Sequence, residues 1–290
     1  MGNLEKKRVK TLPIPWIAIN LSNMNIPEKK AILINSACCY VLAFLFTTIL
    51  HELAHALAGS LSGSNPVMHH NYVEQLNTDH LSSSQRIGIA MAGPLTSLLQ
   101  GLLAGGYFMT VKKRGLLQLF ILWLSILGFN NFLGYVMTGP FFHVGDIGKT
   151  YELLHTSLSV QIVNLVLAAV GLLIVANRMS RPFLEFSYRD SWVNPGNRAV
   201  SFNFNIIMLP WIIGSVIITL LYLPIVHIVS LIYPISSGMI FIYPWQNARR
   251  VKDIRLSERT SLGKVSLTAC ALFIVIIIVF RWLLPPGIPI

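Results

Sequence analysis

Long apolar runs separated by short basic clusters constrain the fold of this 290-residue chain more than any other feature. An α-helix needs about 20 apolar residues to cross the hydrocarbon core of a bilayer. Runs of that order lie at 31–58, 86–111, 115–138 and 158–176, on either side of 224–227, and at 265–284. Hydrophobic residues make up 54% of the chain and charged residues only 11%, which no ordinary soluble domain shows. We therefore predict an all-α polytopic membrane protein with about seven transmembrane helices.

The positive charges fall almost entirely on one side of this topology. If the N-terminus is cytosolic, the inner segments hold 19 of the 22 Lys and Arg residues, and the outer segments hold only Arg86, Lys149 and Arg281. This is the positive-inside pattern of membrane proteins. The net charge of +11 thus follows from topology, and we expect no nucleic-acid partner. We expect an integral protein of a bacterial cell membrane, surrounded by the lipid bilayer.

The sequence HELAH, residues 51–55, lies in the last third of the first predicted span. Residues four apart share one face of an α-helix, so His51 and His55 can present two imidazoles to one ion. In zinc hydrolases with this pattern the ion lowers the pKa of a bound water, and the adjacent glutamate, here Glu52, takes its proton. A polar helix end is the alternative interpretation. Since such groups are costly within a span without a partner, we interpret the motif as a zinc site on the non-cytosolic side.

A catalytic zinc ion normally has three protein ligands, so the chain must supply one more. The extended HExxHxxGxxH pattern is excluded, because Ala58 replaces its glycine and Ser62 its last histidine. Two carboxylates remain open. Glu74 follows the motif in a polar loop, and Asp146 lies in a glycine-flanked break after the third span, on the same side of the membrane as the end of the motif helix. We interpret His143, three residues before Asp146, as a loop histidine.

Three stretches carry a resemblance to a known family: HELAH within a span, MAGPLTS in the next span, and an asparagine-containing segment that leads to Gly145-Asp146. On these the chain, over about residues 31–149, resembles the site-2 protease family of intramembrane zinc metalloproteases. Two positions depart from the family pattern. Ser97 stands where the family usually has asparagine, and Gly-Asp-Ile stands where it usually has Leu-Asp-Gly.

The resemblance implies Zn²⁺ as cofactor, a three-helix metalloprotease core within residues 31–157, and these roles: ligands His51, His55 and Asp146, catalytic base Glu52, and substrate-binding residues Asn130 or Asn131. Residues 1–30 would then form a basic arm, and residues 158–290 additional transmembrane helices. The implied substrate is a transmembrane or strongly apolar peptide, such as a signal-peptide remnant or a small secreted peptide. A helical substrate must be partly extended before cleavage, and the glycine- and asparagine-rich break before Asp146 could supply backbone partners for it.

Two other classes of protein stay open. One is a metal-ion transporter in which the His and Asp residues bind the permeating ion, although the later spans contain almost no charged residues. The other is a non-catalytic binding or assembly protein of the same fold, although the presence of Glu52 favours an enzyme.

Overall fold

The computed structural model describes residues 27–143, 145–223, 233–254, 256 and 261–290. The predicted basic arm before residue 27 and the predicted turn at 224–227 lie outside these residues. Five described helical segments are long and apolar enough to cross a membrane: α1 (Glu28–Ser62), α2 (Ser83–Thr110), α3 (Leu116–Thr138), α5 (Leu158–Leu184) and the segment Gly196–Leu221. The last of these combines α6 (Gly196–Asn203), η3 (Phe204–Met208) and α7 (Leu209–Leu221).

Shorter elements complete the described chain. Apolar α10 (Leu267–Ile278) continues into η6 (Val279–Leu283), 17 residues in all. The remaining elements are α4 (Asp146–Leu153), α9 (Met239–Asn247), η2 (Asp190–Trp192), η4 (Ala248–Arg250), η5 (Ser261–Gly263), and the strands β1 (Asn65–Met68), β2 (Val73–Leu76) and β3 (Ile288–Pro289). The prediction of a mainly helical chain with several helices of membrane length is confirmed, with five such helices described where about seven were predicted.

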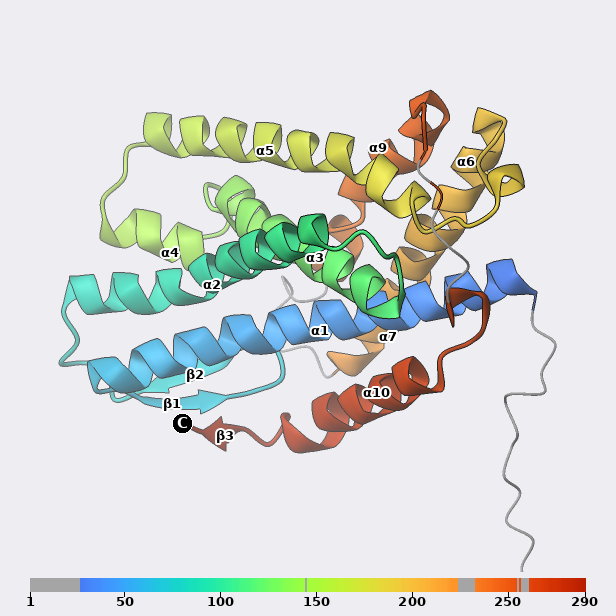
Figure 1. Cartoon of the computed structure of the whole chain (residues 1–290). Coiled ribbons are helices and arrows are strands. Elements are labelled where there is room, and N and C mark those ends of the chain that lie inside the picture. The colour runs from blue at the N-terminus through green and yellow to red at the C-terminus, as the bar shows by residue number, and fades with distance from the viewer. Residues whose placement is uncertain (1–26, 144, 224–232, 255, 257–260) are drawn as a thin grey trace, which may run out of the picture.

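Helix α1 runs along the length of the helical bundle (Figure 1). Its 35 residues extend over about 52 Å, and it packs against α2, α3, α7 and α10. Helix α5 lies on the outside of α3, and much of its surface is apolar and exposed. Helix α1 ends at Ser62 and is capped by Gly63, whose φ of 95° is left-handed and therefore suits glycine.

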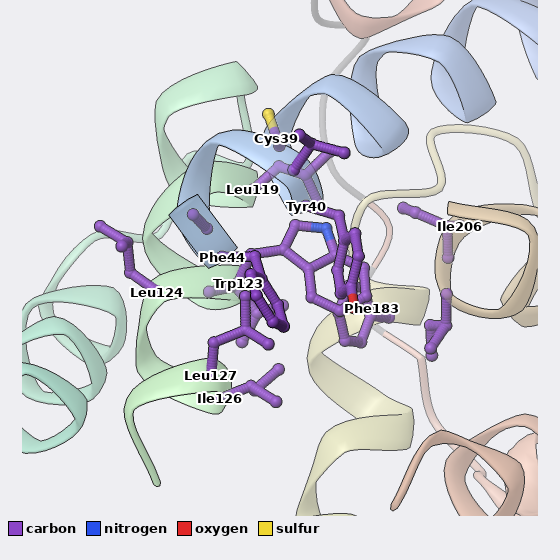
Figure 2. Close-up of a cluster of buried hydrophobic side chains, with 14 of the residues drawn as sticks. Cys39, Tyr40, Phe44, Leu119, Trp123, Leu124, Ile126, Leu127, Phe183 and Ile206 are labelled. Carbon is purple, nitrogen blue, oxygen red and sulfur yellow. The ribbon is translucent and has the colours of Figure 1, made fainter. Parts of the chain in front are cut away.

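Aromatic rings fill the centre of the bundle where α1, α3 and α5 meet (Figure 2). The fully buried Trp123 of α3 lies 5.0 Å from the ring of Tyr40 and 4.9 Å from that of Phe183, measured between centroids. Its indole Nε1 donates a hydrogen bond to Ser36 Oγ at 3.1 Å, and this hydroxyl donates in turn to the carbonyl of Ile206 at 2.6 Å. The contacts of one indole thus connect the N-terminal half of the chain with the C-terminal half.

Glycines, among them Gly101 and Gly105 of α2, allow α2 and α3 to approach closely. A Cβ atom on Gly128 would lie 2.6 Å from the carbonyl oxygen of Ser97 and 2.7 Å from the amide nitrogen of Gly101. The backbones of the two helices are therefore in direct contact at this point. Ser125 Oγ adds a hydrogen bond to the Gly101 carbonyl at 3.0 Å.

The third span ends at Thr138 as predicted, but the break before Asp146 does not include the two asparagines. Helix α3 continues without interruption through Asn130, Asn131 and Gly134, and ends only at Thr138, before Gly139 and Pro140. The backbone amides of the two asparagines are thus used within the helix and cannot pair with a substrate. The physical reason is that every backbone group needs a partner in an apolar environment, which overrides the weak helix propensity of asparagine and glycine.

A small sheet replaces part of the loop between the first two spans. Strands β1 and β2 form an antiparallel hairpin with Asn65 opposite Leu76, and β3, near residue 290, pairs with the other edge of β1. The predicted all-α class is confirmed, and this small sheet is an addition to it. Four-residue strands give too short an alternation for prediction, and the third strand comes from more than 200 residues away.

Candidate metal centre

Three side chains from two separate helices converge at one point. His51 and His55 lie on α1, and Asp146 is the first residue of α4, which packs against α2 and α3. The Nε2 atoms of the two histidines are 3.1 Å apart, and Asp146 Oδ2 lies 3.0 Å from that of His51 and 3.3 Å from that of His55. Both histidines are buried. This is the group of side chains in the described chain that could hold a metal ion.

The spacing fits a metal ion. In a tetrahedral site with ligands about 2.0–2.1 Å from the ion, neighbouring ligand atoms are about 3.3 Å apart. The three distances between the side chains are close to that value. Two imidazole nitrogens that both present lone pairs at such a distance repel each other unless a proton or a cation lies between them. The donor set therefore suits a cation.

Helix α2 supports both histidines through a stripe of residues four apart. His55 Nδ1 lies 2.7 Å from the carbonyl oxygen of Ile89, and His51 Nδ1 lies 3.2 Å from Ser97 Oγ. Between these two positions is Gly93, where a Cβ atom would lie 2.3 Å from His55 Nε2 and 2.6 Å from His51 Nε2. When Nδ1–H donates to these oxygens, Nε2 of each ring is free to bind a cation. A backbone carbonyl can only accept, so Ile89 fixes the tautomer of His55, and the absence of a side chain at Gly93 leaves space beside both Nε2 atoms.

Glu52 follows the first histidine and is also buried, with 7% of its surface exposed. It lies close enough to His51, His55 and Asp146 to interact electrostatically with all three. The ring of Tyr135, from α3, stacks on that of His51 at 5.1 Å between centroids with an angle of 21°. The cluster is therefore enclosed by three helices, α1, α2 and α3, together with α4.

Asn130 and Asn131, predicted as substrate-binding residues, are both buried on α3. Asn131 is one helical turn before Tyr135 and shares its face of the helix. The side chains of both asparagines lie near Tyr233, and Asn131 Oδ1 is buried without a partner among the described residues. This oxygen could accept a hydrogen bond from a substrate, so the substrate-binding role of the asparagines stays a prediction.

The alternative carboxylate, Glu74, lies on the exposed face of β2, outside the cluster. His143 is exposed in the loop before α4, as predicted. The neighbour of Glu74 on β2, Gln75, points the other way. Its Nε2 donates a hydrogen bond to the carbonyl of His55 at 3.1 Å, and its Oε1 accepts one from Ser64 at 2.6 Å. The hairpin is thus attached to α1 beside the cluster.

Sequence reasoning missed most of the supporting residues. It noted Ser97 only as a departure from a pattern and gave Gly93 no role at the site. The signal was present, because Ile89, Gly93 and Ser97 are spaced by four, as are the two histidines, and such stripes face each other in antiparallel helices. No such signal identifies Tyr135, whose contact depends on the packing of α3.

No protein-family model, no curated protein and no solved structure matches this chain. The fold and the cluster alone therefore define its class. It is a mainly helical protein with helices of membrane length and a His–His–Asp cluster, both of whose histidines are buried, that could hold a metal ion.

Proposed function

We propose that this chain is a zinc-dependent intramembrane endopeptidase that cleaves a transmembrane or strongly apolar peptide. The observation that carries the proposal is the convergence of the two histidine nitrogens and the Asp146 carboxylate, spaced like ligands of a tetrahedral ion, with Glu52 buried beside them. Two imidazoles and one carboxylate are a common ligand set of catalytic zinc, which leaves a fourth position open.

Each residue at the cluster has a separate role in the proposed hydrolysis. When bound, a zinc ion polarises a carbonyl oxygen and lowers the pKa of water at its open position. Glu52 accepts the proton of the attacking water at its carboxylate and delivers it to the amide nitrogen that leaves. Ile89 and Ser97 hold the two imidazoles in the tautomer that binds the ion, and Tyr135 fixes the plane of the His51 ring.

An apolar peptide substrate agrees with the surroundings of the cluster. The histidines lie on a helix of membrane length, and a helical substrate in such a place must expose a carbonyl group before attack. Among the described strands, β2 pairs on one edge only, with β1, and Gln75 connects it to the carbonyl of His55. An extended substrate segment could therefore pair with the free edge of β2 next to the cluster.

Replacement of Glu52 by glutamine tests the proposal. The substitution keeps the size of the side chain and removes its capacity to accept a proton, so zinc stoichiometry should stay unchanged while cleavage falls by at least about a hundredfold. Cleavage is measured by mass spectrometry on a panel of co-expressed, tagged single-span membrane peptides. Glu74→Gln, on the exposed face of β2, is the matched control and should cleave normally. Equal cleavage by Glu52→Gln and the unchanged protein would show that the proposal is wrong.

A further inference from the structure

A second polar feature lies at the other end of the bundle from the sheet. There the end of α5 lies close to α9 (Figure 1). Residues near the ends of α2 and α5, and in and after η4, line a cavity of about 650 Å³ that opens to the surface. Its charged lining comprises Arg114, Arg178, Arg181, Arg250, Lys252 and Glu185. Five cationic side chains thus surround one carboxylate, which gives the cavity a formal surplus of four positive charges.

Glu185 is already engaged by two of these cations. Arg114 Nη2 and Nε donate to its Oε2 at 2.7 Å and 3.1 Å, and Arg181 Nε lies 3.7 Å from its Oε1. Arg114 is also held against the ring of Phe108, 4.1 Å from its centroid. Among the described residues no carboxylate forms an ion pair with Arg178, Arg250 or Lys252. Within the described part of the chain, three cations of the cavity thus have no acidic partner and can bind an anion.

The cavity opens toward apolar surface. Leu173, one turn before the lining residue Asn177 on α5, is 63% exposed. On α2 the lining residue Met109 is 78% exposed, and a Cβ atom on Gly106 would meet nothing within 4 Å. Both helices are of membrane length, so this surface faces acyl chains. A ligand that fits the whole feature has an anionic head and an apolar tail.

We propose that this cavity binds the headgroup of an anionic phospholipid. The phosphate group lies between Arg178, Arg250 and Lys252, because guanidinium groups bind phosphate with two parallel hydrogen bonds and ammonium groups as point charges. The acyl chains lie along the exposed faces of α2 and α5. Basic cavities between transmembrane helices favour such lipids over neutral ones. This inference does not depend on the proposed peptidase activity.

General attraction between a basic surface and anionic lipid is the competing explanation, because positive charges gather at one end of many membrane proteins. Lys112 and Lys113 allow specific binding in the cavity to be distinguished from general attraction to the basic surface. They are exposed at the same end of the bundle, next to Arg114, but do not line the cavity. Removing their two charges lowers the surface charge as much as removing two charges from the cavity.

The test is native mass spectrometry of the full chain in detergent, titrated with phosphatidylglycerol or with phosphatidylcholine. The unchanged protein should bind one phosphatidylglycerol molecule in preference to phosphatidylcholine. Arg178→Gln combined with Arg250→Gln should weaken this binding by roughly ten- to thirtyfold, and Lys112→Gln combined with Lys113→Gln by less than about twofold. Lys252→Gln, a single exposed substitution, should weaken it by about threefold and serves if the double variant does not fold.

Three results would overturn the proposal. The first is equal binding of the two lipids by the unchanged protein. The second is an equal loss for the cavity variant and the Lys112 and Lys113 variant, which would indicate surface charge alone. The third is binding of a soluble anion instead of a lipid. In phosphatidylcholine nanodiscs, inorganic phosphate or ATP would then raise the melting temperature of the protein more than added phosphatidylglycerol does. This rise would occur only when the cavity residues are intact.

Discussion

Gly93→Ala tests the architecture of the metal centre by adding a single methyl group. The new Cβ atom would lie 2.3 Å from His55 Nε2, about 1.1 Å inside the 3.4 Å at which ordinary contact begins. It would also lie 2.6 Å from His51 Nε2. Metal–ligand distances in proteins tolerate deviations of only about 0.2 Å. At least one imidazole must therefore leave its position, and we expect zinc affinity to fall by more than about a hundredfold.

The assay is the metal content of the purified protein, followed by titration with zinc in competition with a chelator of known affinity. Gly106→Ala is the matched control, because it adds the same methyl group to the same helix where nothing lies within 4 Å. It should retain one equivalent of zinc. Binding of one equivalent by Gly93→Ala, with the affinity of the unchanged protein, would refute the reasoning that places an ion between the histidines and α2.

Three further predictions follow from the same packing. Asp146→Asn should lose bound metal, whereas Glu74→Gln should retain it, as measured by metal analysis of the two purified variants. Loss of metal in Glu74→Gln with retention in Asp146→Asn would contradict the assignment of Asp146. Ser97→Ala removes the partner of an imidazole Nδ1 and should lower zinc affinity by about 10- to 100-fold, with an unchanged affinity counting against its supporting role. Gly128→Ala should destabilise the bundle by about 1–3 kcal/mol, because its Cβ atom would meet backbone at 2.6 Å, while Gly134→Ala has open space. Thermal unfolding in detergent measures both, and equal melting temperatures would contradict the close approach.

The sequence was most informative where a structural signal is local. Membrane-length helices depend on length and hydropathy, so α1, α2 and α3 lie within a few residues of their predicted bounds. The histidine pair likewise follows from spacing within one helix. The choice between Asp146 and Glu74 could not follow in this way, because it depends on how α4 packs against α2 and α3, about 90 residues after the motif.

Two further features could not be predicted for related reasons. Asn130 and Asn131 suggest a break by their propensities, yet the demand of an apolar environment for internal hydrogen bonds keeps them helical. The sheet needs a partner strand at Ile288 that no local pattern connects to β1. In both cases the missing information is the environment of the segment rather than its own residues.

Pairing of β3 with β1 has a consequence for the order of assembly. All the residues of the candidate metal centre are in place once the chain has been synthesised through α4, which ends at Leu153. The sheet beside it is complete only when Ile288 and Pro289 have reached the same end of the bundle. Until then β1 and β2 form a two-stranded hairpin, which is marginally stable on its own. During biosynthesis, therefore, the residues of the candidate metal centre can come together well before the surface next to them takes its final form.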